Sequence, residues 1–209
     1  MILKNYLHKT WVQLFLFLII GGVISAALKF EVLWDFANYH YYNPWAFLNN
    51  NPSEVMALAG FHSFFNPVVD VPLYLLIEYF NDYPNLIYFV QGMSFGLLAF
   101  IFFRIEKIYF AKADLLIPAL IIGLTGYAVF FQIGTSSNEM QIAVLIMFSF
   151  FLLVKGLFAN PAGGKFLIFI AGLLAGAALG LKYTAVIYCA SLFLSMVAIG
   201  GGIAKRLYP

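Results

Sequence analysis

A dense run of aromatic and polar side chains, WDFANYHYYNPWAFL, occupies residues 34–48, directly after the first long apolar segment. It contains one carboxylate, Asp35, and one imidazole, His40, among phenols, amides and indoles. The remaining polar and aromatic members include Trp34, Asn38, Tyr39, Tyr41, Tyr42, Asn43 and Trp45. Such groups bind sugars and phosphates and transfer protons. Anchoring in a bilayer requires none of this chemistry, so the segment is the first candidate for a functional site.

The composition indicates a polytopic membrane protein. Hydrophobic residues make up 64% of the 209-residue chain and charged residues only 10%, with a mean hydropathy of +0.94. A soluble domain does not have such a composition. The net charge of +2 comes from basic residues dispersed over separate loops, so no nucleic-acid partner is expected.

Six apolar stretches are long enough to cross a hydrocarbon core of about 30 Å as helices. They are Thr10–Leu28, Asn85–Phe103, Leu115–Ile133, Gln141–Phe158, Phe166–Leu181 and Tyr183–Gly201. The fifth merges with the sixth, so five or seven spans are alternatives. We therefore predict an all-α membrane helix bundle that forms a single domain over residues 1–209. This domain is either a complete unit or the N-terminal part of a longer enzyme.

The positions of Lys and Arg predict the orientation, because short cytoplasmic loops retain these residues. With six crossings starting in the cytoplasm, nine of the eleven fall inside, and only Lys29 and Lys182 fall outside. The nine are Lys4, Lys9, Arg104, Lys107, Lys112, Lys155, Lys165, Lys205 and Arg206. Both termini are expected to be cytoplasmic, in a cell membrane such as the bacterial inner membrane, with function on the outer face.

Residues 29–84 form a first outer loop that is longer than a connector needs to be, which is typical of a functional loop. Residues 37–49 are expected to form a short amphipathic helix at the membrane interface. Residues 68–80 are apolar but too short to span, so they are expected to form an interfacial or re-entrant helix. Asp70 lies in this second piece and should face protein or water, because a lipid-exposed carboxylate is costly.

Four features succeed one another along the chain. The first is Asp35, followed by Tyr39, Tyr42 and the Asn49–Asn51 turn, and the second is His62, which precedes a helix that begins with Pro67. The third is Glu139, in the short loop between the third and fourth spans. The fourth is the Gly- and Ala-rich helix that ends at Lys182. Their order and sidedness resemble the GT-C class of integral-membrane glycosyltransferases, which includes protein O-mannosyltransferases and aminoarabinose transferases. That class usually has two adjacent prolines, whereas Pro67 and Pro72 are separated here.

The resemblance implies transfer of a sugar from a polyprenyl-phosphate donor, whose apolar chain lies in the bilayer, to an acceptor hydroxyl. It implies that Asp35 is the general base, that Lys182 and His62 bind the donor phosphate, and that Glu139 is a second acid. Tyr39, His40 and Tyr42 would contact substrate. The leaving phosphate needs charge stabilisation, from a cation or from a divalent metal ion as cofactor.

Simpler interpretations stand beside these roles. Asp35 could be a solvated carboxylate or a helix cap, and the tyrosines could form an interfacial aromatic belt. Lys182 could extend its ammonium from a helix end to the surface, and Glu139 could serve the first turn of a helix. The glycines at 172, 176 and 180 require only close helix packing. A transporter or a non-catalytic lipid-binding subunit is the alternative function, although the spans are nearly free of charge.

Overall fold

The computed structural model describes residues 9–29, 33–51, 59–109, 115–159 and 164–200, and all regular structure in these ranges is helical. Among the basic residues used for the orientation, Lys4, Lys112, Lys205 and Arg206 lie outside the described residues.

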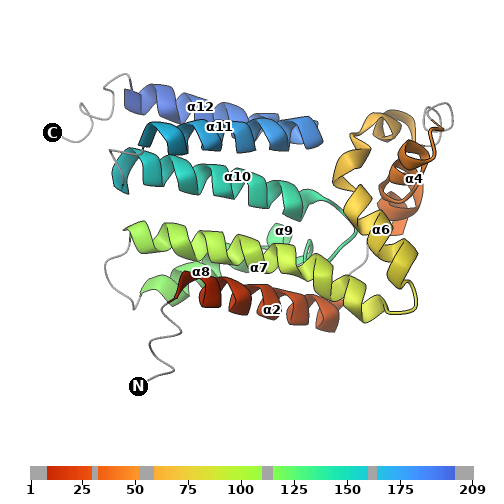
Figure 1. Cartoon of the computed structure of the whole chain (residues 1–209). Coiled ribbons are helices and arrows are strands. Elements are labelled where there is room, and N and C mark those ends of the chain that lie inside the picture. Colours follow the sequence, from red (N-terminus) through yellow and green to blue (C-terminus); the bar gives the residue numbers. More distant parts are fainter. Residues whose placement is uncertain (1–8, 30–32, 52–58, 110–114, 160–163, 201–209) are drawn as a thin grey trace.

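Four helices are long and apolar enough to cross a membrane. They are α2 (Thr10–Leu28), α7 (Pro84–Tyr109), α10 (Glu139–Val154), which continues through the π-helical turn η5 (Lys155–Ala159), and α11 (Gly164–Leu181). The four lie side by side in one bundle (Figure 1). The prediction of an all-α membrane bundle is confirmed at this level.

The third and sixth predicted spans differ from the sequence expectation. Residues 115–133 are not one helix, because α8 (Leu116–Leu124) ends before Gly126 and a short helix, α9 (Tyr127–Phe130), comes next. Gly126 has an extended ψ of 139°, which breaks the helical path. The last helix, α12 (Val186–Gly200), is separated from α11 by Lys182 in an extended conformation and by the 3₁₀ turn η6 (Tyr183–Ala185). The fifth and sixth segments therefore do not merge.

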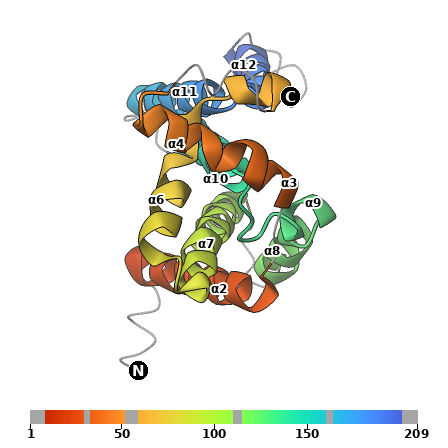
Figure 2. The same ribbon diagram turned by 90° about the vertical axis from the view of Figure 1, so that its right-hand side faces the viewer.

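The segments between α2 and α7 gather at one end of the bundle, which we call the loop end (Figures 1 and 2). They comprise α3 (Leu33–Asp35), the π-helix η1 (Phe36–His40), α4 (Tyr42–Leu48), η2 (Gly60–Phe64), η3 (Pro67–Val69) and α6 (Val71–Phe80). Residues 37–49 and 68–80 were each expected to form one helix. The structure has separate helical pieces instead, η1 and α4 in the first range and η3 and α6 in the second. The start of α2 and the end of α12 lie at the opposite end (Figure 1).

Helices α2 and α7 pack backbone against backbone. A Cβ atom added to Gly21 would lie 2.5 Å from the backbone nitrogen of Gly96, and one added to Gly96 would overlap the carbonyl oxygen of Phe17. At the loop end of this contact, Ser25 Oγ donates a hydrogen bond to the carbonyl oxygen of Tyr88 at 2.7 Å. Small residues allow this approach, as is usual in membrane helix pairs.

The glycines of α11 have a different environment. Cβ atoms added to Gly172, Gly176 or Gly180 would meet nothing within 4 Å. The close packing expected for this ladder is therefore not made with the described residues, and this strip of α11 is open.

Helix α10 is central to the bundle because it contributes to all three clusters of buried apolar side chains. Met140 joins Phe95 of α7, Ile142 and Ile146 join Ala178 of α11, and Leu152 packs near Ala171. Its first residue, Glu139, lies at the loop end, so burial of α10 fixes the position of the polar residues at its start.

Candidate functional site

Two charged residues that the sequence placed on the same side of the membrane form an ion pair. The Lys182 ammonium lies 2.5 Å from Glu139 Oε2 and donates to Asn138 Oδ1 at 2.7 Å. The Lys182 side chain is only 9% exposed, whereas that of Glu139 is 48% exposed. Lys182 therefore does not simply extend into solvent from a helix end. Glu139 lies in the first turn of α10 and also forms an ion pair.

Asp70 is the buried centre of this cluster. Its Oδ1 atom accepts hydrogen bonds from His40 Nδ1 at 2.9 Å and from Asn138 Nδ2 at 3.1 Å. A carboxylate only accepts and an ammonium only donates, so the Asn138 amide must direct nitrogen to Asp70 and oxygen to Lys182. Five residues thus form a continuous chain from His40 to Glu139, which we call the Asp70–Lys182 network.

His40 has an unused hydrogen-bonding position. Because Asp70 accepts from Nδ1, that nitrogen carries a proton, while Nε2 is buried and has no hydrogen-bond partner among the described residues. Its side chain is 1% exposed. An unsatisfied buried polar group typically costs about 1–3 kcal/mol. A water molecule or a ligand hydroxyl at Nε2 would remove this cost.

Asp35 joins the network through Tyr39. The Asp35 carboxylate interacts with the Tyr39 phenol, and the centroids of the Tyr39 and His40 rings lie 4.2 Å apart. Burial, and after it the charge and hydrogen bond of Asp35, raise the pKa of Tyr39 well above its usual range. The phenol therefore remains a neutral donor that orients the carboxylate.

His62 and Tyr42 are placed by ring contacts. The His62 ring stacks on Tyr39 with centroids 5.0 Å apart, and its Nδ1 lies 3.3 Å from the carbonyl oxygen of Ala59. No contact between His62 and Lys182 is among those described. The ring of Tyr42 packs on Trp45, within α4, at 5.4 Å.

The loop before α10 is held in place by its own hydrogen bonds. Thr135 Oγ1 donates to Gln132 Oε1 at 3.1 Å, and Gln91 of α7 donates to the carbonyl oxygen of Thr135 at 3.4 Å. Gly134 adopts a φ of 70°, and a side chain there would collide with Ser25 of α2. The loop is thus fixed on α2 and α7, which positions Asn138.

Sequence reasoning did not identify Asn138 or the partners of Asp70. The only signal for Asn138 was its place directly before Glu139 at an expected helix start, where Asn is a common cap. In another segment, Asn66 donates a hydrogen bond to the carbonyl oxygen of Gly180 at 2.8 Å. This contact brings the chain that precedes α6 to the end of α11, near Lys182.

A second polar pair joins Tyr41, the residue directly after η1, to α6. The hydroxyl of Tyr41 donates a hydrogen bond to Glu78 Oε1. This bond, with a smaller effect of burial, raises the pKa of Tyr41 from 10.0 to about 12.

Tyr41 should therefore titrate late, and its contribution to stability should depend on pH. A raised folded-state pKa stabilises the fold fully below pH 10, and this stabilisation should be lost as the pH rises towards about 12. Carbon-13 NMR of labelled tyrosines, assigned with Tyr41→Phe, measures the midpoint. Glu78→Gln should lower this midpoint towards 10.0. An unchanged midpoint would show that Glu78 is not the cause.

Within the described ranges, no three His, Cys, Asp or Glu side chains come together as a group that could hold a metal ion. The residues present thus do not form a recognisable centre for the divalent metal considered above. Comparisons with protein-family models, with curated proteins and with solved structures found no match to this chain. The interpretation of the site rests on its own geometry.

Proposed function

We propose that the chain is a membrane glycosyltransferase that moves a sugar from a polyprenyl-phosphate donor to an acceptor hydroxyl on the outer face of the membrane. The observation that carries this proposal is the buried Asp70–Lys182 network at the loop end of an apolar bundle, with Asp35 joined to it through Tyr39. Ionisable groups buried at such a position in a membrane protein usually serve function.

The proposed topology has six crossings with both termini in the cytoplasm. Helices α8 and α9 would make the third crossing together, with the break at Gly126 between them. The sixth would be made by η6 and α12, whose helical residues 183–200 measure about 27 Å at 1.5 Å per residue. This arrangement puts Lys182 and the loop end on the outer side, as the distribution of Lys and Arg predicts.

Lys182 would bind the donor phosphate. An ammonium has three donor hydrogens, and Asn138 and Glu139 take two of them, which leaves one for a phosphate oxygen. Glu139 is half-exposed and can turn towards solvent when the phosphate arrives, which would remove the repulsion between the two anions. The open strip of α11 glycines runs from the Lys182 end along the exposed face of the helix and leaves room for an apolar chain.

The proposed transfer is a single displacement. The acceptor oxygen attacks the anomeric carbon of the sugar, and the bond from that carbon to the phosphate oxygen breaks. The electron pair stays on the polyprenyl phosphate, which Lys182 stabilises, and the acceptor proton passes to the Asp35 carboxylate. Attack opposite the leaving group inverts the anomeric centre.

Binding of the donor tests the first part of this proposal. The protein is reconstituted in nanodiscs with a polyprenyl monophosphate, and the retained lipid is measured by native mass spectrometry. Lys182→Ala should lower the affinity about tenfold or more, because a hydrogen bond to a charged group is lost. Lys165→Ala is the matched control, since Lys165 is an exposed lysine at the other end of α11. Equal affinities in both variants would contradict the phosphate role.

Release of polyprenyl phosphate from a polyprenyl-phosphate sugar tests the second part. Asp35→Asn should lower turnover by a factor of about 10²–10⁴, with donor binding unchanged. Full turnover in Asp35→Asn would reject Asp35 as the base. Retention of the lipid without turnover in the unmodified protein would favour the non-catalytic lipid-binding subunit, and movement of an intact solute across the bilayer would favour a transporter.

A further inference from the structure

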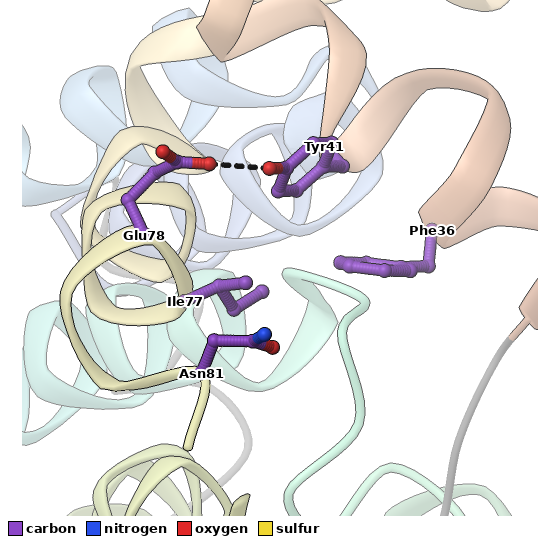
Figure 3. A pocket seen from close by; sticks show the side chains of 5 residues that line it. All are labelled: Phe36, Tyr41, Ile77, Glu78 and Asn81. Atoms are coloured by element: carbon purple, nitrogen blue, oxygen red, sulfur yellow. Dashed lines mark hydrogen bonds between the residues drawn. The ribbon is translucent and has the colours of Figure 1, made fainter. Parts of the chain in front are cut away.

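A separate pocket lies at the loop end, between η1 and the last turn of α6. It has a volume of about 400 Å³ and is lined by Phe36, Tyr41, Ile77, Glu78 and Asn81. Figure 3 shows Phe36 and Tyr41 on one side, facing Ile77, Glu78 and Asn81 on the other. The volume is within the range of about 300–1,000 Å³ that small-molecule sites occupy.

Local geometry explains why these five residues share one space. Residues 77, 78 and 81 lie at spacings that share a face of a helix and its end. On the other wall, the π-helical turn brings Phe36 and Tyr41 together. The backbone nitrogen of Tyr41 donates to the carbonyl oxygen of Phe36 at 3.1 Å, and the centroids of the two side-chain rings are 5.5 Å apart.

The lining favours a particular ligand chemistry. Among the described residues that line the pocket, Glu78 is the only charged one, so this lining does not attract an anion such as a phosphate. One oxygen of Glu78 is occupied by the Tyr41 hydroxyl, and the other remains available as an acceptor. The Asn81 amide can both donate and accept. Aromatic faces beside such groups suit a ring with apolar C–H faces and hydroxyls at its edge.

The pocket and the Asp70–Lys182 network are built from the same two segments. Residues 33–41 direct Tyr39 and His40 into the network and Phe36 and Tyr41 into the pocket, and Asp35 immediately precedes Phe36. Helix α6 has Asp70 at its start and Glu78 in its last turn, about 12 Å along the axis at 1.5 Å per residue. A ligand in the pocket would therefore lie about 12 Å along α6 from Asp70, against a wall formed by Phe36, the residue that follows the proposed base Asp35.

We propose that this pocket binds a neutral sugar ring and is the acceptor subsite, an assignment of role that rests on the proposed glycosyltransferase function. Phe36 and Tyr41 stack on the ring, while Glu78 and Asn81 bind its hydroxyls. The acceptor is then a glycan or glycoconjugate, with its reacting hydroxyl directed from the pocket towards Asp35.

Saturation-transfer NMR of the full chain in nanodiscs tests the site with methyl glycosides of glucose, mannose, galactose, N-acetylglucosamine and arabinose. At least one glycoside should bind, and Glu78→Gln and Asn81→Ala should each weaken it by about tenfold. Asp82→Asn is the matched control, because Asp82 is an exposed carboxylate next to the pocket but outside its lining. Tyr41→Phe, which retains the ring, should weaken binding less than Tyr41→Ala.

Three outcomes would overturn the proposal. Either no glycoside shows saturable binding, or the Glu78→Gln and Asn81→Ala variants bind the glycosides as tightly as Asp82→Asn does, or choline competes for the pocket more strongly than every glycoside. The third would identify an amine site. Lys182→Ala separates this inference from the proposed function. If glycosides bind through Glu78 and Asn81 while Lys182→Ala leaves donor affinity unchanged, the sugar pocket stands and the donor assignment fails.

Discussion

Replacement of Asp70 by alanine should lower the free energy of unfolding by about 3–5 kcal/mol. The Asp70 side chain is 4% exposed, and its Oδ1 atom is the acceptor for both His40 and Asn138. Its removal leaves two buried donors without a partner and frees the amide that orients Lys182. Steric-trap unfolding in bicelles measures the loss. Asp82→Ala, at an exposed carboxylate just beyond α6, should change stability little.

A double variant distinguishes loss of the network from general damage at position 70. In Asp70→Asn with Asn138→Asp, the amide oxygen at 70 can accept from His40, and the amide nitrogen can donate to the carboxylate at 138. That carboxylate then accepts from Lys182. The loss in the free energy of unfolding in the double variant should be smaller than the sum of the losses in the two single variants, by at least about 1 kcal/mol. Strictly additive losses would show that the hydrogen bonds are not connected as described.

Substitution of leucine for Gly96 should disrupt the pairing of α2 with α7. A Cβ atom at position 96 already overlaps the carbonyl oxygen of Phe17, and backbone cannot move aside as a flexible side chain can. Overpacking in a well-packed core costs about 1–3 kcal/mol and occasionally more, and this site should lie at the upper end. Fluorescence energy transfer between labels on the two helices, together with unfolding measurements, tests the expectation.

Gly176→Leu is the matched control for Gly96→Leu. Both glycines are interior to helices long and apolar enough to span a membrane, but a Cβ atom at 176 meets none of the described residues within 4 Å. Leucine at 176 should therefore leave stability unchanged or raise it slightly, because leucine is the better helix former. Equal destabilisation by both changes would mean that the open strip of α11 is covered in the membrane.

The sequence predicted the helices that are marked by a long apolar run within one segment of the chain. Apolar runs of sufficient length marked α2, α7, α10 and α11, because burial in lipid demands such runs whatever their neighbours are. The break at Gly126 was missed, since hydropathy averaged over a window does not register one residue in an extended conformation. Hydropathy also does not show where the turn after Lys182 begins.

The candidate site was predicted in its parts and not in its connections. Lys182 and Glu139 were expected on the same side, and the structure pairs them. Asp70 was expected to face protein, but its bond to Asn138 joins residues 68 positions apart, and no local pattern carries such a pairing. The catalytic and binding roles assigned from the resemblance remain predictions.

The π-helical turn over residues 36–40 has a consequence for the register of the whole segment. A π turn holds one residue more than an α turn, so it shifts the helical phase of the residues before it relative to the residues after it by about 100°. Deletion of Ala37 would allow an ordinary α-helix from Leu33 to Leu48. Asp35 and Phe36 would then rotate away while Tyr41 kept its place. The extra residue of this turn therefore determines which side chains of the segment face the Asp70–Lys182 network and which face the pocket.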